Sequence, residues 1–203
     1  MVKASSMTKH SAKEEQELMA HMWSPRIAED PLAFVMFAFP WGKRGTPLAS
    51  MQGPRQWQID ELNSIRDHIL LNKQLMSQGK HPIVYQLAVS SGRGIGKSAL
   101  VSWLNLWMIS CHLGSTCTVS ANTETQLRSK TTAEIRKWST LLINSHWFDH
   151  TALSFVPSAW FKQAVESQLK IDTGYYYIKA LAWSSENPDA FAGTHSFYGQ
   201  MLC

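Results

Sequence analysis

The chain has 203 residues, of which 44% are hydrophobic and 17% charged, and its formal net charge is +4. This balance excludes an intrinsically disordered chain, and the interrupted apolar runs exclude a transmembrane helix, so we expect a soluble cytoplasmic protein with no membrane partner. The excess of positive charge permits a polyanionic partner without requiring one. The three cysteines, Cys111, Cys117 and Cys203, have no metal-binding spacing and indicate a reducing compartment.

Residues 1–50 are predicted to form a helical or extended N-terminal appendage. Ser11 followed by Glu14 is typical of a capping box that opens a helix. The apolar run between Pro31 and Pro40 predicts a short helix, because proline is favoured in the first helical turn and disfavours helix in the residue before it. We interpret this helix as a packing element, followed by a loop rich in glycine and proline.

The next elements predict an α/β fold. Residues 56–76 carry apolar side chains three or four positions apart, which predicts an amphipathic helix. The apolar run 83–89 predicts a buried strand, and the run 99–113 predicts a buried helix. Residues 115–121 are rich in β-branched and small side chains and predict a second strand, whereas residues 123–143 return to helical spacing. This alternation indicates a largely parallel sheet with crossover helices.

The remainder of the chain is less regular. Residues 146–168 show no clear period. Residues 169–183 predict a β-hairpin that turns near Asp172-Thr173-Gly174. A loop is expected over residues 184–195, and residues 198–203 predict the start of another strand.

The most informative motif lies between the predicted strand and the buried helix. It consists of Ser91, Gly92, Arg93, Gly94, Ile95, Gly96, Lys97 and Ser98. Glycines let a backbone wrap closely around phosphates, and successive N–H groups at a helix N-terminus favour an anion. In such a phosphate-binding loop Lys97 reaches the phosphates of ATP and the Ser98 hydroxyl holds Mg²⁺. Ser91 departs from the usual glycine, and a glycine-rich turn without a nucleotide is the alternative.

Three further segments carry motifs that belong together with this loop. They are residues 53–58 (GPRQWQ), 120–127 (SANTETQL) and 187–195 (NPDAFAGTH). In this order and rough spacing, the four motifs resemble the large terminase subunit of tailed bacteriophages, and the similarity runs from about Trp23 to the last residue. The resemblance implies a P-loop NTPase fold of the RecA/ASCE type, incomplete at the C-terminus, in which residues 51–203 form a partial ATPase domain.

The resemblance also implies a function. Terminases of this family use ATP to drive double-stranded DNA into a viral capsid, so the chain would be the ATP-binding portion of a DNA-packaging motor in a bacterial host cell. The implied partners are double-stranded DNA, a small terminase subunit and the portal of the procapsid, and the full-length parent would form an oligomeric ring.

Individual residues acquire expected roles from the same resemblance. Arg55, Trp57 and Gln58 are expected to contact adenine, with Gln58 at the edge of the base and Trp57 or Arg55 on its face. Arg93 and Lys97 are expected to act as catalytic residues at the γ-phosphate. The alternatives are a core tryptophan at position 57 and a solvent-facing arginine at position 93.

Basic residues follow the third motif on the next predicted helix: Arg128, Lys130, Arg136 and Lys137. Their positive charges make them candidates for contacts with DNA phosphates. The alternative is an ordinary solvated helix face.

A P-loop motor that hydrolyses ATP also needs acidic residues to help hold Mg²⁺ and to activate water. No such pair occurs in residues 198–203, and the nearest acids, Glu186 and Asp189, lie in a predicted loop. We therefore expect the chain to bind ATP weakly and to hydrolyse none on its own. The alternative function is a non-catalytic, nucleotide-responsive module that binds DNA or protein. A P-loop kinase or other metabolic NTPase has no supporting substrate-site motif here.

Overall fold

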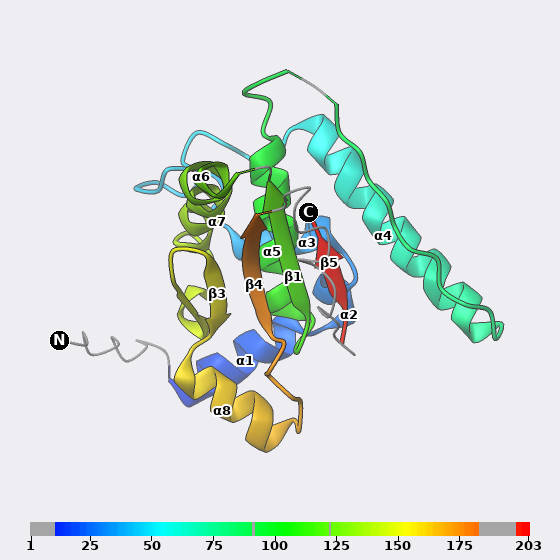
Figure 1. Ribbon diagram of the computed structural model, residues 1–203. Helices are drawn as coiled ribbons and strands as arrows, with labels where there is room; N and C mark the ends of the chain where they lie inside the picture. Colours follow the sequence, from blue (N-terminus) through cyan, green and yellow to red (C-terminus); the bar gives the residue numbers. More distant parts are fainter. Residues whose placement is uncertain (1–10, 91, 122, 183–197) are drawn as a thin grey trace.

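The computed structural model describes residues 11–90, 92–121, 123–182 and 198–203 (Figure 1). Within these residues one sheet of five strands has the order β2-β3-β4-β1-β5. The strands are β1 (Thr116–Ala121), β2 (Phe148–His150), β3 (Ser154–Pro157), β4 (Tyr177–Ala182) and β5 (Gln200–Leu202). β1 runs parallel to both β4 and β5, whereas β3 is antiparallel to β2 and to β4. The α/β class is confirmed, and the sheet is mixed, with its parallel part centred on β1.

Three helices form in the N-terminal segment, and two of them, α1 and α3, form where the sequence predicts them. They are α1 (Ala12–Met22), α2 (Pro25–Ala28) and α3 (Pro31–Ala38). The capping box is present, because the Glu14 N–H donates to Ser11 Oγ at 3.3 Å and the Ser11 N–H donates to Glu14 Oε2 at 2.7 Å. Pro31 occupies the first turn of α3, and the carboxylate of Asp30 caps that turn by accepting from the Ala33 N–H at 2.9 Å.

Two longer helices frame the phosphate-loop region. α4 (Gln56–Ser77) confirms the predicted amphipathic helix, and α5 (Lys97–Cys111) confirms the predicted buried one. α5 packs on one face of the sheet and also contacts α3 (Figure 1). α4 begins beside the first turn of α5, packs on α3 through Leu62 and Ile65, and then projects away from the sheet.

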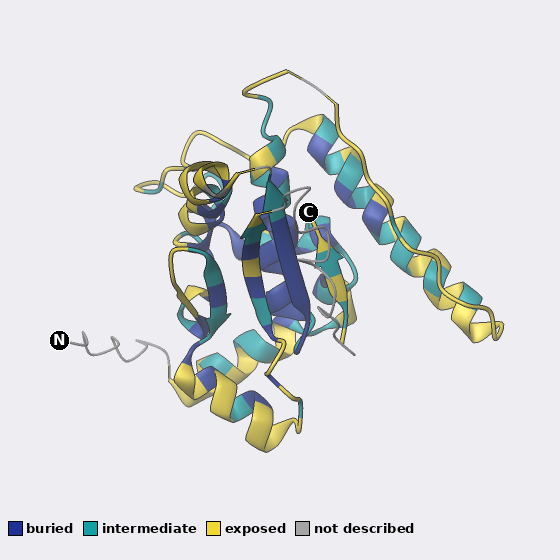
Figure 2. Cartoon of the chain, in the orientation of Figure 1, coloured by how far each residue is buried: buried dark blue, intermediate teal, exposed yellow. Residues whose placement is uncertain are grey.

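The predicted strand over residues 83–89 is wrong. This segment is extended but belongs to no strand, and it runs along the outer side of α4 (Figures 1 and 2). The Ile83 N–H donates to Asn72 Oδ1 at 2.8 Å, and the Tyr85 hydroxyl donates to Ser64 Oγ at 2.9 Å. An apolar run of this length identifies a strand only if a neighbouring strand pairs with it, and β1 already pairs with β4 and β5 on its two sides.

The exposed position of this segment gives a direct prediction. Val84 is 78% exposed, whereas Val119 in β1 is 2% exposed. We expect Val84→Lys to change the free energy of unfolding by less than about 0.5 kcal/mol, as for other surface substitutions. Val119→Lys should destabilise the protein by several times that amount, because it buries a charge. Urea denaturation of both variants measures the difference. A large loss in Val84→Lys would mean that residues 83–89 are a core strand.

The predicted helix over residues 123–143 is shorter and less regular than expected. It consists of α6 (Glu124–Gln126), a π-helical turn (Leu127–Thr131) and α7 (Thr132–Ser139). The Thr132 hydroxyl donates to the carbonyl oxygens of Leu127, at 2.8 Å, and Arg128, at 3.1 Å. The Thr132 N–H also donates to the Leu127 carbonyl, and this backbone bond over five residues is the spacing of the π turn.

The predicted hairpin over residues 169–183 is also wrong. A 3₁₀ turn (Ser145–Trp147), the β2–β3 hairpin and α8 (Ala159–Gln168) occupy the stretch that lacked a clear period. Asp172 then closes a turn by accepting from the Gly174 N–H at 2.8 Å, and the Thr173 hydroxyl bonds Glu166 of α8. Only residues 177–182 form a strand, because they pair with the distant β1 instead of with residues 169–175.

One hydrophobic core joins the N-terminal helices to the sheet and α5. It includes Met22, Phe34, Leu106, Trp147 and Ile178, each 2% exposed or less.

Among the described helices, none is both long enough and apolar enough to span a bilayer. All three cysteines are free thiols, and burial raises the pKa of Cys111 and of Cys117.

Candidate functional site

The described part of the phosphate loop, residues 92–98, turns sharply into the N-terminus of α5. Gly94 and Gly96 have φ values of 78° and 95°, which residues other than glycine adopt only with strain. Gly96 is the N-cap residue of α5, and no side chain caps this helix terminus. Ser91 lies outside the described residues.

Most backbone N–H groups of the loop, at the N-terminus of α5, have no acceptor among the described residues. Within the described part of the chain, no hydrogen bond is made by four of them, those of Gly94, Ile95, Gly96 and Ser98. The N-terminus of a 15-residue helix such as α5 carries a partial positive charge, and its first N–H groups have no acceptor within the helix. This arrangement favours an anion with several acceptor oxygens.

The polar side chains of the loop lie at the surface. The ammonium group of Lys97 donates to the Gly92 carbonyl at 2.7 Å, so it folds back over the loop. Arg93 and Ser98 are exposed, and Arg93 makes no hydrogen bond or ion pair with a described residue. The three side chains expected at the phosphates and at Mg²⁺ therefore all lie on this one surface loop.

The first turn of α4 holds the loop from the other side. Three successive loop carbonyls accept hydrogen bonds from it: Arg55 Nη1 donates to Gly94 at 3.3 Å, Trp57 Nε1 to Ile95 at 3.1 Å, and Gln58 Nε2 to Gly96 at 2.9 Å. The Gln58 amide is 3% exposed, and its Oε1 accepts from the Arg55 N–H at 2.9 Å. The motif at residues 55–58 thus packs directly against the phosphate loop.

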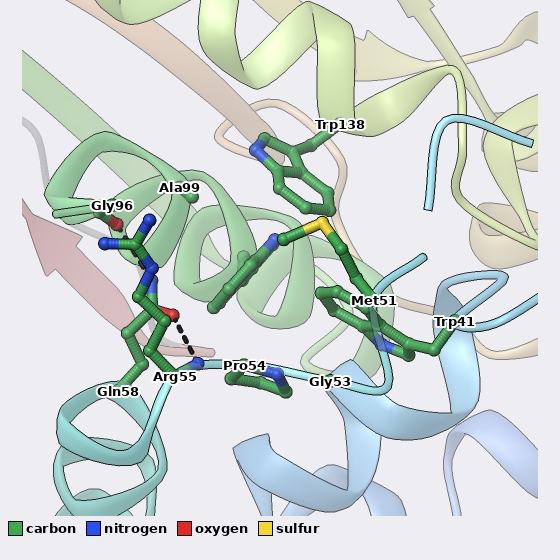
Figure 3. Close-up of a pocket in the computed structure, with 10 residues that line it drawn as sticks. Trp41, Met51, Gly53, Pro54, Arg55, Gln58, Gly96, Ala99 and Trp138 are labelled. Carbon is green, nitrogen blue, oxygen red and sulfur yellow. Dashed lines mark hydrogen bonds between the residues drawn. The ribbon is translucent and has the colours of Figure 1, made fainter. Parts of the chain in front are cut away.

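An aromatic pocket of about 100 Å³ lies beside the loop (Figure 3). Figure 3 shows Arg55, Gln58 and Gly96 on one side of it and Trp41, Met51 and Trp138 on the other. Gly53, Pro54, Ala99 and Trp103 complete its lining. The centroid of the Trp103 ring lies 4.9 Å from that of Trp138 and 5.8 Å from that of Trp41, and Trp103 Nε1 is buried without a hydrogen-bond partner.

Only two of the three residues expected to contact adenine line this pocket. Arg55 and Gln58 line it, whereas Trp57 does not and is bonded to Ile95 instead. Sequence reasoning missed Trp41, Trp103 and Trp138, which come from three distant segments. The one sequence signal that could have indicated such a cluster is the count of nine tryptophans.

The arrangement of the described residues does not add support for the predicted metal and DNA contacts. Among the described residues, no group of three or more His, Cys, Asp or Glu side chains is placed to hold a metal ion. Glu186 and Asp189 lie outside the described part of the chain. Arg136 donates to the Thr151 carbonyl at 2.8 Å, and Lys137 lies 2.6 Å from Glu134. These contacts are typical of a solvated helix face, and DNA binding stays a prediction.

Comparison of the chain with protein-family models, with curated proteins and with solved structures found no match in any of the three. The geometry of the loop, the α4 contacts and the aromatic pocket are therefore the structural basis for a functional proposal.

Proposed function

We propose that this chain binds ATP and Mg²⁺ through the phosphate loop at residues 91–98. The observation that carries the proposal is the orientation of the loop: three of its successive carbonyls accept hydrogen bonds from α4, while the N–H groups of Gly94, Ile95, Gly96 and Ser98 have no acceptor among the described residues. A triphosphate supplies the acceptor oxygens that these N–H groups lack. Lys97 and Arg93 supply positive charge, and the Ser98 hydroxyl is the protein ligand for Mg²⁺.

The aromatic pocket is the place for the base. Its walls are apolar and planar, which suits a flat heterocycle. The planar guanidinium of Arg55 lies at its mouth on the side of the loop. Gly96 and Ala99 line the pocket as well as belonging to the loop and the first turn of α5, so a single nucleotide can place its base in the pocket and its phosphates at the loop.

We further propose that the chain is the nucleotide-binding portion of a terminase-type DNA-packaging motor with a P-loop NTPase fold. The four ordered sequence motifs support this, and so does the parallel part of the sheet next to α5. Double-stranded DNA, a small terminase subunit, a portal and a ring of motor subunits follow from the same proposal.

Lys97→Ala tests nucleotide binding. We expect the substitution to weaken binding of Mg²⁺-ATP by about 10- to 100-fold, since hydrogen bonds to charged groups contribute roughly 1.5–3 kcal/mol. Isothermal titration calorimetry on both proteins measures the change. Lys162→Ala, in an exposed ion pair of α8, is the matched control and should bind like the parent. Equal affinity of Lys97→Ala and Lys162→Ala would contradict the proposal.

A further inference from the structure

We propose that Trp57 and Gln58 are positioning residues of the phosphate loop, which act on a bound ligand through the hydrogen bonds that they make with the loop backbone. The inference rests on the proposed function, because it concerns how the same site recognises phosphate. The polar atoms of both side chains bond the loop backbone: Trp57 Nε1 bonds Ile95 and Gln58 Nε2 bonds Gly96. The Gln58 amide is also buried and bonded through its oxygen to the Arg55 N–H, which holds its orientation.

These contacts decide which way the loop N–H groups point. In a planar trans peptide, the carbonyl and the N–H of the next residue point in opposite directions. The carbonyls of Gly94 and Ile95 point to α4, whereas that of Gly96 is shared between Gln58 and the Leu100 N–H of α5, at 3.1 Å. The N–H groups of Ile95 and Gly96 must therefore point away from α4. Such a row of N–H groups forms an anion-binding concavity.

The backbone conformation of Gly96 depends on the same contact. Gly96 has a φ of 95° and lies so close to Gln58 that an added Cβ would be 2.8 Å from its Nε2. Gln58 thus both bonds the Gly96 carbonyl and fills the space that a side chain at position 96 would need. The motif at residues 55–58 pre-organises the loop, which lowers the entropic cost of ordering it around a ligand.

Binding of two ligands separates positioning from base contact. The probes are Mg²⁺-ATP and Mg²⁺-tripolyphosphate, which has the phosphates without the base, each titrated calorimetrically. The variants are Trp57→Phe, which keeps an aromatic ring, and Gln58→Met, which keeps the length of the side chain. We expect each substitution to weaken the binding of both ligands by the same factor, about three- to tenfold for the loss of one hydrogen bond to the loop. A weaker ATP complex with unchanged tripolyphosphate binding would overturn the proposal.

Hydrogen exchange of the ligand-free protein gives a readout that needs no ligand. The Leu100 amide donates to the Gly96 carbonyl at 3.1 Å, so it should exchange faster when that carbonyl is no longer held, in Trp57→Phe and Gln58→Met, than in Gln56→Ala. Gln56 lies in the same helical turn and is exposed, and among the described residues its side chain bonds only Asp60, at 2.8 Å, so it is the matched control. Equal exchange of the Leu100 amide in all three variants would overturn the positioning role. If the parent chain binds neither probe, the proposed function fails, while the exchange rates still decide the inference.

Discussion

Trp147→Ala is expected to lower the free energy of unfolding by about 3–5 kcal/mol, the range for truncation of a buried tryptophan. Trp147 is fully buried, and its ring stacks on Phe161 with centroids 4.7 Å apart and contacts Trp23 at 5.8 Å. Its Nε1 donates to Glu15 of α1, so truncation also leaves that carboxylate without one partner. A loss of this size is a large fraction of the stability of an ordinary domain.

Chemical denaturation monitored by circular dichroism measures this loss. Trp160→Ala is the matched control, because Trp160 contacts the same aromatic side chains but is 38% exposed. The centroid of its ring lies 6.0 Å from that of His146 and 5.5 Å from that of Phe161. We expect a cost below about 1.5 kcal/mol in the control, since much of its ring is already in water. Equal losses in the two variants would mean that α1 and the sheet do not share a core.

The features that the sequence predicts correctly are those set by nearby residues. Ser11 and Glu14 are three positions apart and satisfy each other's backbone groups, so the start of α1 can be predicted from four residues. Pro31 and Pro40 delimit α3 for an equally local reason. The sharp turn into α5 is recognisable because Gly94 and Gly96 permit backbone angles that other residues avoid.

The features that the sequence does not reveal depend on distant partners. Residues 83–89 and 177–182 are both apolar and extended, but only the second segment has a strand beside it, β1, about sixty positions earlier in the chain. Hydrophobic periodicity contains no information on this choice. The role of Trp57 and Gln58 was hidden in the same way, because the loop carbonyls that they bond lie 38 positions away.

The aromatic pocket shows the same limit at the site. Trp41, Trp103 and Trp138 come from the loop after α3, from α5 and from α7, and each is unremarkable in its own segment. Their edge-to-face and tilted ring contacts exist only after the three segments pack together. The sequence could therefore predict the glycine-rich turn into α5, whereas the place proposed for the base required the fold.

Gly96→Ala is expected to abolish measurable binding of Mg²⁺-ATP, a weakening of at least about 100-fold. The substitution has two costs. A φ of 95° is strained for alanine, at roughly 1–3 kcal/mol, and the new Cβ would lie 2.8 Å from Gln58 Nε2. Gln58 cannot yield without releasing the Gly96 carbonyl and the Arg55 N–H, so the loop loses the orientation that its N–H groups need.

Gly92→Ala is the control for this prediction, because an added Cβ there meets no atom within 4 Å and Gly92 is outside the positive-φ set. We expect Gly92→Ala to fold with the stability of the parent chain and Gly96→Ala to lose about 1–3 kcal/mol. Calorimetry with Mg²⁺-ATP and urea denaturation together separate loss of binding from loss of folding. If Gly96→Ala bound ATP as tightly as Gly92→Ala, a nucleotide could not depend on the α5 N-terminus in the conformation described, because the loop would tolerate a different orientation of the Gly96 peptide.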